Sequence, residues 1–313
     1  METNIDLPYV VQGDLRRLMK QWWTSGGGVS IPNTLFFEEL RKEFYKDFHR
    51  IFGRNLYFLH EESINQGLAV LIGNCERWIV PIDRVFYQGG PVFDITRRID
   101  RDLKNWGLGP RGSSDPLPVQ VREYVAKLKR KKINTIWLLD DAVYTGNEVW
   151  EAANLFESHG LVVEKVIAGV AIGKGIERMR RRNPPVDVRG AYEFPEALDI
   201  VHERDFYVGV PLSGANVKDE DEESVPYVNP WGKGKLLVQN AHIPPEWVEE
   251  LSQSCILRSL KLWERCEEES ELPLRCEHLP MKVPGFRLKE RVVKAFERLI
   301  MHPDQFDPEL PCR

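Results

Sequence analysis

The chain has 313 residues, of which 42% are hydrophobic and 29% are charged, and its formal net charge is −5. This composition is typical of a soluble globular protein with one large domain or two small ones. The negative net charge does not indicate tight nucleic-acid binding. The five cysteines form no CxxC pair, which indicates free thiols in a reducing compartment. No basic segment followed by an apolar core opens the chain, and every apolar run is too short to cross a bilayer. We therefore expect a cytoplasmic protein that does not bind a membrane.

Two amphipathic helices are expected near the N-terminus, over residues 12–23 and 34–52. In the second, Leu40, Phe44 and Phe48 recur at helical spacing among charged residues. The stretch "TSGGGVSIPN" between them reads as a glycine-rich connector.

The central region alternates short apolar runs with amphipathic segments. The apolar runs cover residues 77–83, 133–141, 161–173 and 205–212. Helical patterns lie around the second run, as "VREYVAKLKRKK" before it and "EVWEAANLFESHG" after it. Strands that alternate with helices imply β–α units, so we predict an α/β fold with a mainly parallel open sheet.

Beyond residue 240 the pattern becomes helical again, in "PPEWVEELSQSCILRSLKLWERCEEE" and "RLKERVVKAFERLI". We therefore expect three segments along the chain. They are an N-terminal helical segment over residues 1–60, an α/β core over 61–215 and a C-terminal helical extension over 216–313.

The stretch "INTIWLLDDAVYTGNEVWEAANLF" (133–156) ends an apolar strand with two adjacent carboxylates, Asp140 and Asp141. Buried charge is costly unless it is paired, metal-bound or turned into a cleft. The loop that follows leads into a helix, whose first N–H groups and positive dipole end favour an anion. An anion cradle beside two carboxylates suits a 5-phosphorylated ribose. The alternative is a strand–helix turn whose aspartates only cap the helix.

The segment "LLDDAVYTGNE" resembles the signature of the type I phosphoribosyltransferases, in which apolar residues, two acids and a short variable stretch precede Thr-Gly. The resemblance implies that Asp140 and Asp141 hold the ribose hydroxyls of phosphoribosyl pyrophosphate, as catalytic and metal-binding residues. It also implies Mg²⁺ as the cofactor, bridging the pyrophosphate and the sugar. The residues that would hold the 5-phosphate are Ala142, Val143, Tyr144, Thr145, Gly146 and Asn147.

Two later segments also fall where this family places binding residues. Lys174 follows the run "AGVAIG", and the resemblance implies a catalytic lysine that contacts the base. In "RDFYVGVPL", Asp205 and Phe206, or Tyr207, would lie beside the base. A solvated loop lysine is the alternative for the first segment.

An upstream segment, "WIVPIDRVFYQGGPVFDITRRI", resembles the strand, loop and helix that form the family's pyrophosphate loop. Arg84 or the amides around Gly89 and Gly90 would then receive the diphosphate. An ordinary glycine turn is the alternative.

The chain departs from the family at Glu148, where a Thr or Ser normally binds the phosphate. Two negative charges about 4 Å apart repel by roughly 1 kcal/mol in water and about 4 kcal/mol at a protein surface. Three explanations are open: Glu148 turns away, a metal or an arginine offsets its charge, or the loop no longer binds the usual 5-phosphate.

The function expected from these features is Mg²⁺-dependent transfer of ribose 5-phosphate to or from a nitrogenous base. The alternative is a non-catalytic protein that senses a nucleotide and contacts a protein partner through its C-terminal helices. A chain of this kind also resembles phosphoribosyltransferase-like proteins of bacterial antiviral defence systems.

Overall fold

The structure is a computed structural model, and it describes residues 6–24, 29–82, 84–87, 89–100, 102–111, 114–217 and 224–306. The chain forms two compact units, each built from stretches that are separate in sequence. The first unit comprises Met1–Phe58, Arg98–Trp106 and Val201–Arg313, and the second comprises Leu59–Arg97 and Gly107–Ile200. The expected segments 1–60, 61–215 and 216–313 stay a prediction about domains, because compactness does not show which part of the chain folds by itself.

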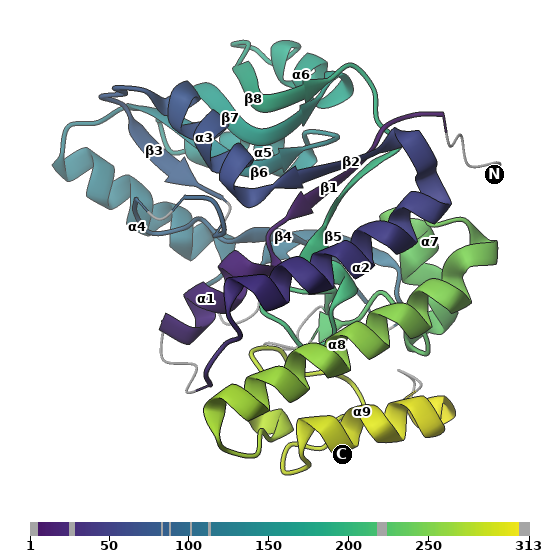
Figure 1. The fold of residues 1–313 in the computed structure, drawn as a ribbon. Coiled ribbons are helices and arrows are strands. Elements are labelled where there is room, and N and C mark those ends of the chain that lie inside the picture. The colour runs from purple at the N-terminus through teal and green to yellow at the C-terminus, as the bar shows by residue number, and fades with distance from the viewer. Residues whose placement is uncertain are drawn as a thin grey trace. The chain divides into compact units, whose positions relative to one another are not determined.

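The second unit contains a four-stranded sheet in which all the strands are parallel (Figure 1). Its strands, in spatial order, are β3 (Trp78–Pro81), β6 (Thr135–Val143), β7 (Val162–Ile172) and β8 (Asp187–Phe194). The helices of this unit are α3 (Glu61–Ile72), α4 (Leu117–Arg130), α5 (Asn147–Glu157) and α6 (Gly173–Arg180). The predicted α/β class with a parallel sheet flanked by helices is therefore confirmed.

Each face of this sheet is covered by helices. On one face, Ile136 and Leu138 of β6 belong to a buried cluster that includes Leu128 of α4 and Phe156 of α5. On the other face, α3 packs closely on β7 and β8, and a Cβ placed on Gly67 would lie 2.5 Å from the Cβ of Ala191. Successive strand residues point to opposite faces, which explains why β6 reads as a nearly continuous apolar run.

The first unit is largely helical. Its helices are α1 (Leu15–Thr24), α2 (Thr34–Phe52), α7 (Lys235–Ala241), α8 (Val248–Ser270) and α9 (Val292–Met301). Asn33 caps α2, since its Oδ1 accepts a hydrogen bond from the N–H of Phe36 at 3.1 Å. Phe44 and Phe48, on the apolar face of α2, are fully buried. The helices expected at both ends of the chain are confirmed.

The remaining strands form two small sheets. One has the order β2 (Leu56–His60), β1 (Tyr9–Gly13), β9 (Asp199–His202). The other has the order β11 (Ser224–Val225), β10 (Ala215–Val217), β4 (Ile95–Ile99), β5 (Asn105–Pro110). Short 3₁₀ helices cover Gly53–Asn55, Glu203–Phe206, Trp231–Gly234, Pro245–Trp247, Cys276–His278 and Pro303–Phe306.

Two predicted elements are wrong. Residues 205–212 are not a strand: a 3₁₀ helix ends at Phe206, and the φ angles of Gly209 (81°) and Leu212 (60°) are incompatible with an extended chain. This segment is apolar because it is buried in irregular conformation. The loop after β3 leads to strand β4 and not to a helix, because Ile95 and Ile99 are buried and β4 pairs with β10.

None of the helices in the described part of the chain combines the length and the apolarity needed to cross a bilayer. The described cysteines, Cys75, Cys255, Cys266 and Cys276, form no disulfide, and Cys312 lies outside the described residues.

Candidate functional site

The two aspartates lie at the carboxyl end of β6, as predicted. Asp140 is aligned with Ala168 of β7, and the strand continues to Val143. Asp140 is buried and Asp141 is half-buried. The Oδ1 atom of Asp140 accepts a hydrogen bond from the N–H of Asp141 at 2.9 Å, which fixes the orientation of the buried carboxylate.

The loop between β6 and α5 is held by two glycines. Gly146 is the N-cap of α5 and has a left-handed φ of 74°, which glycine adopts without strain. A Cβ on Gly175, in α6, would lie 2.8 Å from the carbonyl oxygen of Tyr144 and 3.0 Å from that of Val143. The loop backbone therefore packs directly against the first turn of α6.

The loop presents some of its residues to solvent. Thr145 and Asn147 are exposed, Ala142 and Tyr144 are half-buried, and Val143 and Gly146 are buried. No side-chain hydrogen bond caps α5 at Gly146, so the helix start is not closed by its own N-cap side chain. This is the geometry in which a helix N-terminus can receive an anion.

Lys174 lies beside the loop. Its Nζ atom is 3.3 Å from the centre of the Tyr144 ring, and the Tyr144 hydroxyl donates a hydrogen bond to the carbonyl oxygen of Leu198 at 2.6 Å. Burial lowers the pKa of Lys174, and nearby Asp199 opposes that shift. Burial also raises the pKa of Tyr144 to about 12, with Asp199 adding to the shift and Arg97 opposing it. The predicted catalytic lysine is thus near the loop, with its ammonium group on an aromatic face.

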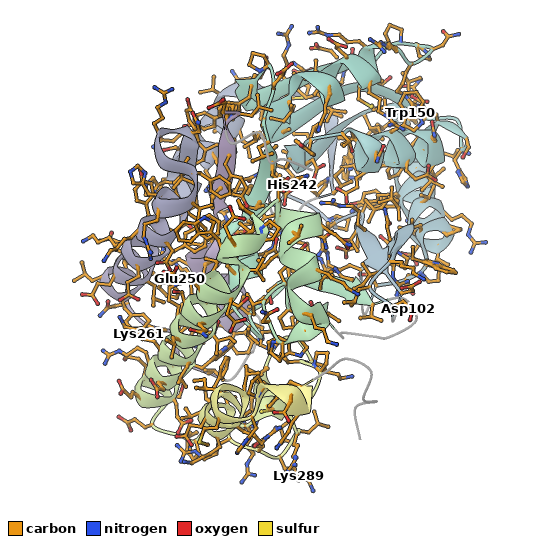
Figure 2. All side chains as sticks on the ribbon, turned by 90° about the vertical axis from the view of Figure 1, so that its right-hand side faces the viewer. Asp102, Trp150, His242, Glu250, Lys261 and Lys289 are labelled. Atoms are coloured by element: carbon orange, nitrogen blue, oxygen red, sulfur yellow. The ribbon has the colours of Figure 1, made fainter. Side chains whose placement is uncertain are left out.

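Glu148 forms an ion pair with Arg97, with 3.7 Å between its Oε1 and the Nε of the arginine. Of the three explanations open at the sequence level, the structure shows an arginine beside the glutamate. A second arginine, Arg178 of α6, lies next to the loop, with its Cδ 3.5 Å from the position that a Cβ on Gly146 would take. Its guanidinium lies over the ring of Trp150, which is labelled in Figure 2.

Arg84 is engaged by another side chain. Its Nε donates a hydrogen bond to Asp94 at 2.6 Å, and its NH2 group also donates to Ser114 at 3.0 Å. A diphosphate would therefore have to compete with a carboxylate for this guanidinium. Gly89 and Gly90 lie in the same loop, and a Cβ on Gly90 would meet no atom within 4 Å.

Asp205 and Phe206 belong to the first unit and are packed inside it. The Phe206 ring is fully buried, 5.5 Å from the ring of Phe44 and 4.8 Å from that of Phe48. Asp205 accepts a hydrogen bond from the N–H of Gly214 at 3.2 Å, and burial raises its pKa. Tyr207 is buried as well. In this structure Phe206 is a core residue whose ring offers no surface for stacking, and base contact by Asp205 stays a prediction.

Whether this chain could hold Mg²⁺ depends on the acidic residues near the loop. Within the described ranges, no group of three or more His, Cys, Asp or Glu side chains could hold a metal ion by itself. Asp140 and Asp141 offer carboxylate oxygens from adjacent positions of one strand. Mg²⁺ prefers oxygen ligands and is usually bound by one or two carboxylates together with substrate phosphates and water. These residues therefore fit the ion only as partners of a phosphorylated ligand.

Several residues near the loop were not predicted. Arg178 follows Lys174 by four positions on α6, so helical spacing could have placed both on one face. Arg97 and Asp199 come from distant parts of the chain, and no local pattern marks them.

No protein-family model and no curated protein matches the chain. Solved structures that are similar to part of it include two phosphoribosyltransferases. The orotate phosphoribosyltransferase of Mycobacterium tuberculosis H37Rv, solved with inorganic phosphate, is 13% identical over 42% of this chain and 68% of its own, with a TM-score of 0.23. The adenine phosphoribosyltransferase of Thermoanaerobacter pseudethanolicus is 15% identical over 42% of this chain and 79% of its own, with a TM-score of 0.24.

Proposed function

We propose that the protein binds a phosphoribosyl ligand at the carboxyl end of β6 and, with Mg²⁺, transfers ribose 5-phosphate to or from a nitrogenous base. The observation that carries the proposal is the junction of β6 and α5. There Asp140 and Asp141 lie within the last four residues of the strand, and Gly146 opens a helix that no N-cap side chain closes. An anion site and two carboxylates next to each other would suit a 5-phosphorylated ribose.

The charges around the loop support phosphate binding. The carboxylate of Glu148 is paired with Arg97, while Lys174 and Arg178 add positive charge beside the same loop. The unpaired N–H groups at the start of α5 and the dipole of this helix also favour an anion at the loop. These groups act against the repulsion expected from Glu148 alone.

The two carboxylates would bind the ribose hydroxyls. Hydrogen bonds from hydroxyls to an ionised carboxylate are short and strong, and Asp140 is already oriented by the N–H of Asp141. When bound, Mg²⁺ would neutralise the charge of the pyrophosphate. The remaining work of the protein is to hold the ribose and the leaving group in position and to exclude water, which needs no covalent catalyst.

One observation favours the non-catalytic alternative, in which the protein senses a nucleotide, for example within a defence system. Arg84 is held by Asp94, and the Phe206 ring is buried. Two of the groups expected to contact pyrophosphate and base are therefore occupied or covered. Ligand binding at the loop does not depend on either of them.

The proposal is tested by isothermal titration with phosphoribosyl pyrophosphate and Mg²⁺. We expect the wild type to bind, and the double variant Asp140→Asn/Asp141→Asn to lose measurable binding while its thermal transition changes little. Asp187→Asn, at the opposite end of the same sheet, is the control and should bind like the wild type. Equal affinity in the double variant, or a wild type that binds no phosphoribosyl ligand, would contradict the proposal. Release of pyrophosphate in the presence of a panel of bases then separates transfer from sensing.

A further inference from the structure

The C-terminal end of α4 carries a dense group of positive charges. Five of the six residues from 127 to 132 are basic, and we call these five the α4 basic patch: Lys127, Lys129, Arg130, Lys131 and Lys132. Lys127 is half-buried and the other four are exposed, whereas Leu128 between them is in the core. Within the described part of the chain, none of the five forms an ion pair with a carboxylate.

The helix dipole accounts for only part of this patch. Basic residues in the last turn of a helix are stabilised by its negative end, which covers Lys127, Lys129 and Arg130. Lys131 and Lys132 follow the helix, and Lys132 has a left-handed φ of 57°. Lys127 and Lys131 both approach the ring of Trp78, so their like charges lie close together and repel. An anionic partner would relieve that repulsion.

Trp78 holds two of the ammonium groups in place. The Nζ atom of Lys131 is 4.4 Å from the centre of the Trp78 ring, and that of Lys127 is 5.2 Å from it. Cation–π contacts of this kind restrict the side chains before a partner arrives. The conformational entropy that these two lysines lose on binding is therefore smaller than for lysines without such contacts.

The α4 basic patch is separate from the candidate phosphoribosyl site. Lys131 and Lys132 lead into the amino end of β6, whereas the loop that follows Asp141 leaves its carboxyl end. The nine residues of β6 span about 26 Å. The patch carries a charge of +5, so the rest of the chain sums to −5 − 5 = −10. The negative net charge therefore does not exclude a local positive surface.

The charge density of the patch matches that of a nucleic acid. Lys127, Lys129 and Arg130 lie within four helical residues that rise about 6 Å, so these cations are spaced at about one per 2 Å, close to the one phosphate per about 1.7 Å of duplex axis. A membrane surface fits less well, because peripheral binding needs inserted apolar side chains as well as charge. In the described ranges, α4 has no exposed large hydrophobic side chain that could insert into a membrane. Val162, at the start of β7, is exposed, but one such residue does not form an apolar patch.

We propose that the α4 basic patch binds the sugar–phosphate backbone of nucleic acid without regard to sequence. Lysines act there as point charges toward phosphates, and binding releases the counterions condensed on the strand. A partner bound at this end of the sheet leaves the carboxyl end of β6 open. The interaction therefore holds whether or not the protein is a phosphoribosyltransferase.

Fluorescence anisotropy with a labelled 20-base-pair DNA duplex and a labelled 20-nucleotide RNA tests this. We expect wild-type affinity to fall with salt between 50 and 200 mM, with a log–log slope approaching about −4.5 on duplex DNA if all five cations contact phosphates. Lys129→Gln/Lys132→Gln should reduce the slope by about 1.8, and Lys129→Glu/Lys132→Glu should lose binding at least tenfold. The matched control is Lys42→Glu/Lys46→Glu, which makes the same charge change at exposed positions of α2. It should stay within about threefold of the wild type.

Three results would overturn the inference. One is no binding to either nucleic acid at 50 mM salt. Another is an equal loss of affinity in the α2 control, which would show that only net charge matters. The third is stronger, patch-dependent binding to vesicles containing phosphatidylserine or to polyglutamate, which would assign the surface to a membrane or to an acidic protein. Thermal melts of the glutamine variant check that its fold is intact.

Discussion

At the scale of single residues, Glu148 decides how well the loop after β6 can hold a phosphate. Its partner Arg97 is two-thirds exposed, so the pair is at the surface and screened by solvent. We predict that Glu148→Thr binds phosphoribosyl pyrophosphate more tightly than the wild type, by about 1 kcal/mol or roughly fivefold. The substitution removes a negative charge, frees the guanidinium of Arg97 and adds a hydroxyl donor.

Isothermal titration at 50 and 300 mM salt checks this, because a charge effect at an exposed position weakens with ionic strength. Glu151→Thr, one turn further along α5, is the control and should change the affinity less. If Glu148→Thr and the wild type bind equally at low salt, the carboxylate of Glu148 is too far from the phosphate to matter.

Single residues also show the limit of local patterns. The two aspartates and the Thr-Gly of the loop stand next to one another in sequence, so their position at the end of β6 could be predicted. Arg97 could not, because nothing near residue 97 signals that its side chain will meet residue 148. The same holds for Arg84, whose basic side chain suggested a free anion contact but is held by Asp94.

At the scale of elements, the junction of β6, α5 and α6 depends on the absence of a side chain at Gly175. A Cβ there would lie 2.8 Å from the carbonyl oxygen of Tyr144 and 2.9 Å from Cγ1 of Val143. Since backbone atoms cannot move aside as a flexible side chain can, we predict that Gly175→Ala lowers the free energy of unfolding by about 1–3 kcal/mol. The loop should shift with it, so anion binding should also weaken.

Urea denaturation measures the first effect. The control is Gly90→Ala, because a Cβ on Gly90 would meet no atom within 4 Å and its φ is not positive. That variant should stay within about 0.5 kcal/mol of the wild type. A Gly175→Ala protein with wild-type stability would show that α6 can move away from the loop without cost.

Several elements of the chain could be predicted because their hydrophobic period is clear. The strand ending at Asp141 and the helix carrying Phe44 and Phe48 are examples. Residues 205–212 could not, because a buried irregular segment is as apolar as a strand, and only the backbone angles of Gly209 and Leu212 distinguish them. Pairing between β4 and β10, which are more than a hundred residues apart, likewise leaves no local signal.

At the scale of the whole molecule, buried and partly buried ion pairs join distant segments of the chain within the first unit. Arg204 pairs with Asp14, Arg41 donates to Glu203 at 3.0 Å, and Arg258 pairs with Asp47. The partners are separated by 190, 162 and 211 positions in sequence, so this unit is complete only when distant segments meet. Removing one partner of a buried pair leaves an uncompensated charge, which is far more costly than losing an exposed pair.

The last prediction concerns acid stability. Burial alone would raise the pKa of Asp14, but Arg204 and His202 outweigh it, so the pKa lies below the usual value of 3.8. A carboxyl group with a lowered pKa stabilises the fold above the unfolded pKa, and that stability is lost as the pH falls below about 4. We predict that Asp14→Asn costs about 3–5 kcal/mol at pH 7, where the buried Arg204 loses its partner. The cost should shrink as the pH is lowered through that range, because the wild-type carboxylate becomes protonated.

Urea denaturation at pH 7, 5, 4 and 3 measures both parts of this prediction. The control is Glu43→Gln, which removes a pair with Lys261 (labelled in Figure 2) in which both side chains are nearly half-exposed. Its cost should be below about 1 kcal/mol at every pH, since exposed ion pairs contribute little. If Asp14→Asn costs no more than this control, the buried pair does not stabilise the first unit. If its cost is large but the same at every pH, the loss comes from packing or hydrogen bonds instead of the carboxylate's charge.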